Sequence, residues 1–117
     1  SATCPGLQLI GFRRDGAEAT WTIDNATDAD LHLEGIPNLK WEVRNPLAEV
    51  WMGGQKILPP EGALIGGDAA FAIPRDERTR VAARSGKDFT LVFLWADTEP
   101  LLSFELTFTG GCTLRVP

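Results

Sequence analysis

The chain has 117 residues, of which 23% are charged and 44% are apolar, so it is long enough for one folded domain with its own core. Its formal net charge of −5 argues against nucleic acid or an anionic membrane as a partner, because both are negatively charged. No run approaches the roughly 18 apolar residues of a membrane-spanning helix, so we expect no membrane insertion.

The first half of the chain alternates apolar and polar residues over short runs, which is typical of β-strands with one buried face. Residues 13–16 are expected to form a turn, and Ile36-Pro37 to interrupt a strand, because proline donates no hydrogen bond to a ladder. Gly53-Gly54 predicts a hairpin, because glycine readily adopts the positive φ angles of a two-residue turn. The predicted strands are 7–12, 17–24, 31–34, 39–44, 49–52 and 55–58.

The second half continues the pattern. Residues 61–70 are glycine-rich and predict a loop, whereas 75–84 fits either a short helix or an edge strand at 78–82. The run 88–95 is almost continuously apolar and predicts a central strand buried on both faces. Further strands are predicted at 69–73, 102–109 and 112–116.

Turn residues separate these strands, and no stretch has a convincing helical period. No internal repeat, linker or low-complexity tract divides the chain. We therefore predict an all-β fold, an antiparallel immunoglobulin-like β-sandwich of about eight or nine strands, as a single domain over residues 1–117.

The two cysteines, Cys4 and Cys112, lie near opposite ends of the chain. Neither belongs to a CxxC motif or has a second ligand-type residue at metal spacing, which argues against zinc and thioredoxin-like sites. Their even number and their places beside predicted strands favour a disulfide, and with it secretion or display on the cell surface. Two free buried thiols are the alternative.

Catalysis has little support in the sequence. His32 is the only histidine, on the predicted solvent face beside Glu34, and no GxSxG motif supplies a nucleophile. A surface pair of His32 and Glu34 explains the pattern, so we expect no enzyme, no catalytic residue and no cofactor.

Asp24 ends the second predicted strand, and the polar turn that follows contains Asp28 and Asp30. Calcium prefers oxygen ligands, but Ala26 occupies an expected ligand position, and Asp and Asn also stabilise turns through their own backbone. Turn chemistry is therefore favoured over a calcium site. A glycosylation sequon also begins at Asn25.

Flat aromatic side chains can stack on sugar rings, so the four tryptophans raise carbohydrate binding as a function. Trp21 and Trp95 fall on faces assigned to the core. Trp41 shares a face with apolar neighbours, whereas Trp51 lies in a hairpin that could project outward. An exposed strip of Trp51 and Trp41 would form a carbohydrate-binding surface.

The motifs along the chain resemble a module of bacterial secreted and surface proteins. Cys4, a strand ending in Gly11-Phe12, and the strand 19–25, which is similar to "SWTITN", match its opening. The resemblance continues through Leu39-Lys-Trp41, 50–54, the 85–87 turn and Gly111-Cys112. It implies an immunoglobulin-like sandwich, exported as one piece of a larger surface or pilus-related protein. It names no reaction or ligand.

The chain departs from antibody domains, because the cysteines are terminal and no tyrosine exists to form a tyrosine corner. We expect a non-catalytic structural module of a surface protein, pilus or filament, which contacts itself or neighbouring domains. Strand edges, the Gly53-Gly54 hairpin and residues 61–67 are the expected contact elements. The alternative is a carbohydrate-binding module that uses Trp51 and Trp41.

Overall fold

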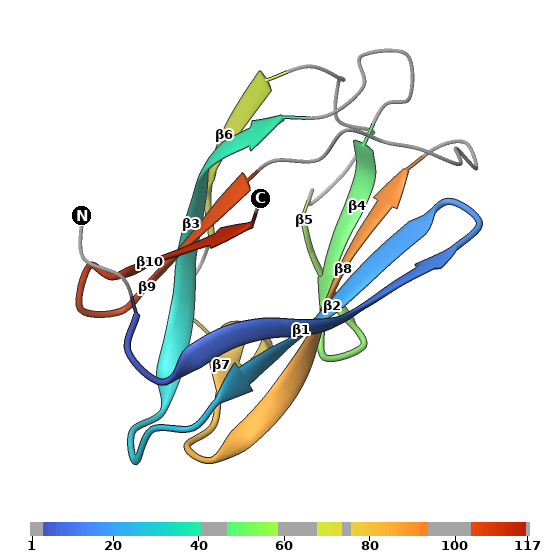
Figure 1. Ribbon diagram of the computed structural model, residues 1–117. Coiled ribbons are helices and arrows are strands. Elements are labelled where there is room, and N and C mark those ends of the chain that lie inside the picture. The colour runs from blue at the N-terminus through green and yellow to red at the C-terminus, as the bar shows by residue number, and fades with distance from the viewer. Residues whose placement is uncertain (1–3, 41–46, 59–67, 74–75, 94–103, 117) are drawn as a thin grey trace.

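The computed structural model describes residues 4–40, 47–58, 68–73, 76–93 and 104–116, which fold into two antiparallel β-sheets (Figure 1). The strands are β1 (Leu7–Asp15), β2 (Glu18–Asn25), β3 (Leu31–Lys40), β4 (Leu47–Met52), β5 (Gln55–Leu58), β6 (Asp68–Ala72), β7 (Arg80–Val81), β8 (Ser85–Phe93), β9 (Phe104–Phe108) and β10 (Thr113–Val116). A short 3₁₀ helix, η1 (Glu77–Thr79), precedes β7.

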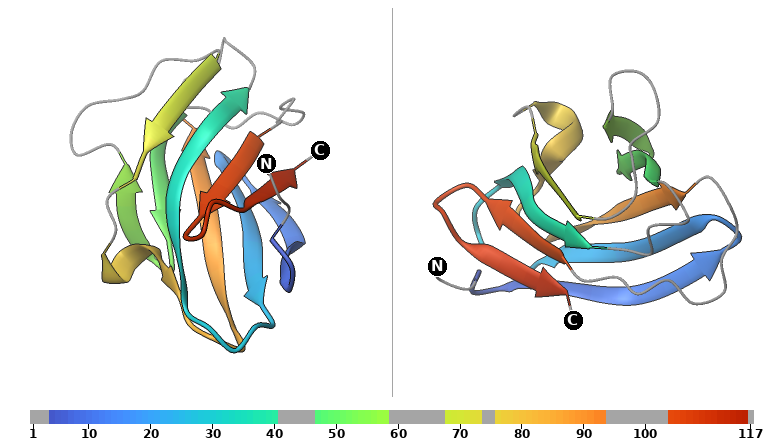
Figure 2. Two further views of the ribbon diagram at one scale, coloured as in Figure 1. Left: turned by 90° about the vertical axis from the view of Figure 1, so that its left-hand side faces the viewer. Right: turned by 90° about the horizontal axis from the view of Figure 1, so that it is seen from above.

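One sheet has the strand order β1-β2-β8-β4-β5, and the other has the order β10-β9-β3-β6 with β7 paired to the start of β3. The strands of the two sheets stack as two layers (Figure 2). This arrangement confirms the predicted all-β sandwich.

The core between the sheets consists of alternate residues of the central strands. Trp21 of β2 meets Phe104 of β9 edge to face, with ring centroids 5.0 Å apart, and Phe89 of β8 lies 5.8 Å from the same ring. Because a Phe-to-Ala change in a core costs about 3–5 kcal/mol, these rings contribute much of the adhesion between the sheets. The buried residues of the three strands are Ala19, Trp21, Ile23, Phe89, Leu91, Phe93, Phe104, Leu106 and Phe108.

The prediction that the apolar central strand is buried on both faces is wrong. β8 is indeed central, but Thr90 and Val92 on its outer face are only half-buried, and Leu94 and Trp95 of the predicted strand lie outside the described residues. The neighbouring strands contribute Thr20, paired with Thr90, and Trp51, also paired with Thr90, to that face. The outer face therefore carries a mixture of polar and apolar side chains.

Strand β1 is longer than predicted and contains a bulge. It continues to Asp15, and the turn consists of Gly16 and Ala17 instead of residues 13–16. The pairing of β1 with β2 changes register between Ile10 and Arg13, next to Gly11, whose φ angle is +64°. A bulge places two residues opposite one, so Phe12 reaches Trp21 with ring centroids 4.9 Å apart.

Strand β3 runs through Ile36-Pro37, so the predicted interruption there is wrong. Its pairing with β6 shifts register between Ile36 and Leu39, and such an irregularity tolerates a residue without an N–H donor. Leu39 and Lys40 continue β3 instead of starting a new strand, and residues 41–44 of the predicted 39–44 strand lie outside the described residues.

The ambiguous segment 75–84 contains both of the predicted alternatives, the helical turn η1 and the two-residue strand β7. Asp76 caps η1 by accepting a hydrogen bond from the backbone N–H of Arg78, and the Thr79 hydroxyl accepts one from the backbone N–H of Asp76. This reciprocal capping satisfies donors that a short helix cannot pair internally.

The predicted disulfide is present between Cys4 and Cys112, whose Cα atoms are 5.0 Å apart. Cys4 precedes β1 and Cys112 precedes β10, which are edge strands of different sheets on the same side of the sandwich (Figure 2). The bridge therefore joins the two sheets as well as two positions 108 residues apart. Among the described residues, no helix is long and apolar enough to cross a membrane.

Candidate functional site

The catalytic and metal-binding candidates do not gather in one place. His32 is half-buried on β3, where it pairs with Arg80 of β7. Within the described ranges, no three His, Cys, Asp or Glu side chains form a group that could hold a metal ion. Asp30 and Asp76 both interact electrostatically with His32, but each carboxylate is already bound by an arginine and by a backbone N–H group.

Two of the three turn carboxylates are used in structural contacts. Asp30 accepts a hydrogen bond of 2.8 Å from the backbone N–H of Ala83 and forms an ion pair of 3.0 Å with Arg80. The Ala83 hydrogen bond and then the Arg80 contact lower the pKa of Asp30. Asp28 pairs with Arg84, whereas Asp24 is half-buried on β2. The turn therefore holds the end of the sandwich together through arginines.

Asn25, the first residue of the sequon, is fully buried at the end of β2. Its amide nitrogen donates to the carbonyl oxygens of Ala29, Val81 and Ala82 at 2.9, 3.1 and 3.2 Å. Its Oδ1 accepts hydrogen bonds from the backbone N–H and the hydroxyl of Thr27 at 3.0 and 2.6 Å. The sequon match thus coincides with a structural tie between β2, the following turn and β7, which the sequence pattern alone did not distinguish.

The Gly53-Gly54 hairpin has the predicted geometry. The glycines have φ angles of +61° and +81° between β4 and β5. Gly53 donates a hydrogen bond of 2.8 Å to the Asp88 carbonyl, and a Cβ at Gly53 would lie 2.8 Å from Cε of Lys87. Position 53 thus requires glycine for two reasons: the turn needs a positive φ angle, and the aliphatic part of the Lys87 side chain leaves no room for a Cβ atom.

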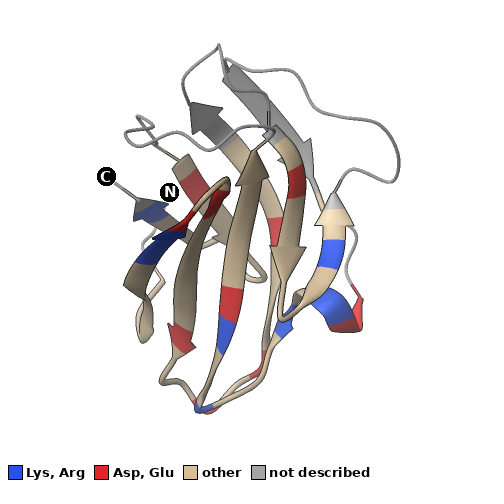
Figure 3. Ribbon diagram, turned by 90° about the vertical axis from the view of Figure 1, so that its right-hand side faces the viewer, with Lys and Arg blue, Asp and Glu red and all other residues tan. Residues whose placement is uncertain are grey.

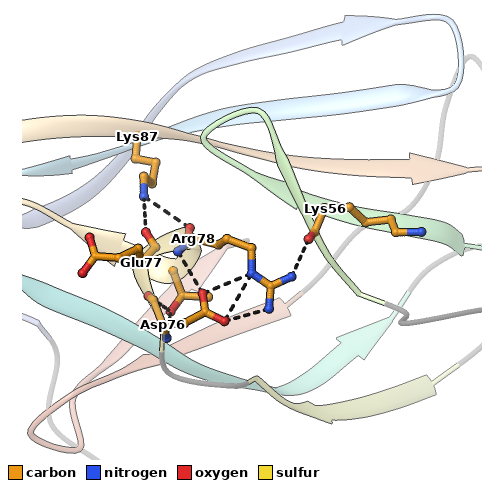
Figure 4. Close-up of polar contacts among 6 residues, drawn as sticks. Lys56, Asp76, Glu77, Arg78 and Lys87 are labelled. Carbon is orange, nitrogen blue, oxygen red and sulfur yellow. Dashed lines mark hydrogen bonds and ion pairs between the residues drawn. The ribbon is translucent and has the colours of Figure 1, made fainter.

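A polar clasp, made by Lys56, Asp76, Glu77, Arg78 and Lys87, links η1 to the first sheet (Figure 4). Arg78 contacts both carboxylate oxygens of Asp76 and donates a hydrogen bond of 3.0 Å to the Lys56 carbonyl on the edge strand β5. Lys87 donates from β8 to the carbonyls of Glu77 and Arg78, each at 3.2 Å. The clasp therefore covers part of the β5 edge.

Within this clasp, hydrogen bonding to Arg78 favours the charged forms of two groups, whereas burial disfavours the charged form of a third. The hydrogen bonds from Arg78 lower the pKa of Asp76 and, reciprocally, raise the pKa of Arg78. Desolvation lowers the pKa of Lys87, because burial disfavours its charged form. All of these groups are occupied by one another or by backbone carbonyls, so the clasp is a structural element.

The outer face of the first sheet contains a shallow hollow of about 320 Å³, close to the lower limit of small-molecule sites. Strand register places its residues in three rows across the sheet. Val92 lies between Glu18 and Glu49 in the first row, Thr90 lies between Thr20 and Trp51 in the second, and Asp88 pairs with Thr22 in the third. The hollow is lined by Glu18, Glu49, Trp51, Gly54, Asp88, Thr90 and Val92.

Trp51 is half-buried in this hollow, and its indole N–H donates a hydrogen bond of 2.7 Å to a carboxylate oxygen of Glu49. The sequence-based candidate Trp51 is therefore accessible and held in one orientation. Its proposed companion, Trp41, lies outside the described residues. The carboxylates that border the hollow were not predicted, because only sheet register brings β2, β8 and β4 together.

Charge is unevenly distributed over this face. Figure 3 shows Asp and Glu positions on β2, β8 and β4, and Lys or Arg positions on the outer strands β1 and β5 and on β8. The cation of β8 is Lys87, which donates to backbone carbonyls of η1. Asp88 is partly compensated, because Thr22 donates to it at 3.0 Å and Arg13 lies 3.4 Å from its other oxygen. Glu18 and Glu49 add further negative charge beside the indole.

Comparison with known proteins adds no family: no family model matches the chain, and no curated protein or solved structure matches it significantly.

Proposed function

We propose that this chain is a non-catalytic, exported structural module, a building block of a cell-surface protein, pilus or filament. The proposal is carried by the edge strand β1, which presents Ile10 and Phe12 with 47% and 55% of their surface exposed. They are the only large apolar side chains classed as exposed in the described part of the chain. Apolar residues on a free strand edge favour pairing with a strand of a neighbouring molecule.

Two other edges differ from β1 in ways that discourage such pairing. On the β5 edge, Arg78 donates a hydrogen bond to the Lys56 carbonyl. The edge strand β10 is only four residues long and carries an exposed arginine, Arg115. Charges and short edge strands are common protections against edge-to-edge association. Strand β1 also carries a bulge followed by Arg13 and Arg14, but residues 7–10 before the bulge contain no charged side chain. This first part of β1 is therefore the edge that the contrast supports for assembly.

The disulfide supports the exported part of the proposal. Disulfides persist in oxidising compartments such as the cell exterior, and this one closes the sandwich where the two sheets meet. A surface module benefits from such a bond, because it resists unfolding without depending on other subunits.

Light scattering coupled to size exclusion, together with negative-stain microscopy, tests this proposal. We expect dimers or polymers that increase with concentration, and we expect Ile10→Lys to abolish them, because the new charge occupies the apolar edge. Gln55→Lys is the matched control, since it adds the same charge at an exposed position of β5, at the opposite edge of the same sheet. A wild-type chain that stays monomeric at every concentration, or an Ile10→Lys variant that assembles normally, contradicts assembly through β1.

A further inference from the structure

We propose that the hollow beside Trp51 binds a sugar ring that carries no acidic group. The inference concerns a binding activity and does not depend on assembly through β1, because the hollow lies over β8 and β4 in the middle of the sheet. A module can carry both surfaces, one for its neighbours and one for a polysaccharide.

The first argument is that the Trp51 indole is already held in a fixed orientation. Trp51 contributes a flat apolar surface, and its hydrogen bond to Glu49 restricts the side chain before any ligand arrives. Binding to an ordered side chain loses less conformational entropy than binding to a free one. The apolar C–H face of a sugar ring matches such a surface, as aromatic side chains combine a large apolar area with a polar edge.

The second argument is the arrangement of polar groups around the indole. Glu18, Glu49 and Thr90 line the same hollow from three adjacent strands, and the Thr90 hydroxyl shares a hydrogen bond of 3.0 Å with that of Thr20. Carboxylates accept hydrogen bonds, which sugar hydroxyl groups can donate. A shallow apolar floor with a few convergent acceptors is the combination expected of a site for a polyhydroxylated ring.

The third argument is charge, which selects among sugars. Glu18, Glu49 and Asp88 line the hollow, and its described lining contains no Lys or Arg. Arg13 pairs with Asp88, and Lys56 lies opposite Trp51 on the neighbouring strand β5 without lining the hollow. A uronic acid or sulfated sugar would therefore meet like charge, and a neutral or amino sugar would not. The proposed ligand class is thus the neutral hexoses and amino sugars of surface polysaccharides.

Isothermal titration calorimetry with three hexasaccharides tests the charge selection, using oligomers of glucose, glucosamine and galacturonic acid at the same ionic strength. We expect heat of binding with the glucose or glucosamine oligomer and weaker or no binding with galacturonate. Tighter binding of galacturonate overturns the proposed selectivity, and the absence of binding to all three overturns the sugar site.

Substitutions at and away from the hollow then locate the site. We expect Trp51→Ala to weaken binding about tenfold or more, as truncation of a central aromatic anchor does in other interfaces, and Trp51→Phe to retain part of the affinity. A thermal midpoint and an intact disulfide identify folded variants. An unchanged affinity in folded Trp51→Ala contradicts the assignment.

A rim variant keeps the test independent of the tryptophan. Glu18→Arg places a long cationic side chain at the exposed edge of the hollow, and we expect it to weaken glucosamine binding about tenfold. Asp24→Arg makes the same change of charge on the same strand, about 20 Å away, and should leave binding nearly unchanged. Equal effects of the two variants would mean that overall charge, and not this hollow, governs binding. Because no step requires oligomers, these readouts are separable from the assembly experiment.

Discussion

On one side of the sandwich a covalent bond between Cys4 and Cys112 joins the edges of the two sheets, whereas on the other side the polar clasp covers the β5 edge (Figure 2). The covalent side depends on two residues at opposite ends of the sequence. The clasp depends on residues from η1, β5 and β8, and its hydrogen bonds run to the Asp76 carboxylate and to backbone carbonyls.

The two closures act on different states of the chain. A disulfide restricts the unfolded ensemble, so in the chain-entropy model its contribution grows with the length of the enclosed loop and is insensitive to moderate acid. The clasp exists only in the folded state and contains a carboxylate whose pKa is lowered by Arg78. Reductant and acid should therefore affect the two sides separately.

The largest expected effect is that of removing the bridge. Reduction, or the double change Cys4→Ser and Cys112→Ser, should lower the free energy of unfolding by at most about 4–5 kcal/mol and the thermal midpoint by about 15 °C. The physical reason is the large loop that the bond closes. Chemical denaturation and calorimetry with and without reductant measure the effect.

Reductant should have no further effect on the double serine variant, which serves as its control. A thermal midpoint that is unchanged by reduction, with two thiols titratable in the reduced native protein, would remove the bridge as a stabilising element and leave the polar side as the principal closure.

A smaller effect is expected at the end of the sandwich, where Asn25 ties β2 to β7 in a purely non-covalent way. Asn25→Ala removes the amide donor from the carbonyl groups of Ala29, Val81 and Ala82, of which the Val81 hydrogen bond is buried, and this should cost about 3 kcal/mol. Equilibrium unfolding in urea measures the loss. The measured loss of stability can then be compared directly with the loss caused by removing the disulfide.

Asp28→Ala is the control, because it alters the same turn at an exposed ion pair with Arg84 and should change stability much less. If the two variants lose equal stability, burial of the Asn25 amide is not the cause, and the comparison between covalent and buried polar ties does not hold.

The smallest expected effect is the acid response of the clasp. Because Arg78 lowers the pKa of Asp76 below its ordinary value of 3.8, the folded state releases this proton more readily than the unfolded state. The resulting stabilisation is complete above the unfolded pKa and is lost as pH falls through the lower folded pKa. The wild-type protein should therefore lose stability as the pH falls below 3.8, and the Asp76→Asn variant should lose less over the same range. Unfolding at a series of pH values measures the difference.

The same series on the double serine variant completes this test. Its acid response should match that of the wild type, because the clasp is intact on the other side of the sandwich. Asp30 also has a lowered pKa, through Ala83 and Arg80, so Asp76→Asn should reduce the acid response without eliminating it. An acid profile that Asp76→Asn does not alter contradicts the role assigned to the clasp.

Local patterns predicted much of the fold. Trp21, Phe89 and Phe104 lie in the core as their alternation indicates, and Gly53-Gly54 forms the predicted hairpin turn. Prediction failed where a strand changes register or partner. The β1 bulge after Ile10 and the passage of β3 through Pro37 depend on neighbouring strands, which no window of sequence contains.

The candidate site was predicted only in part. Trp51 stood out as an aromatic residue in a projecting hairpin, but Glu18 and Asp88 carry no local signal that relates them to it. They line one hollow because β2 and β4 both pair with β8. Asn25 matched a modification motif in the sequence, yet its burial gives it a structural role.

The sequence by itself determined the layered β architecture and favoured the pairing of its two cysteines, because a period of two and an even, isolated cysteine pair are local or countable properties. Only the tertiary structure decided which strands are neighbours, and therefore which carboxylates surround Trp51 and how the β5 edge is protected. The physical reason is that sheet register joins residues far apart in the chain, and it is set by the packing of the whole core.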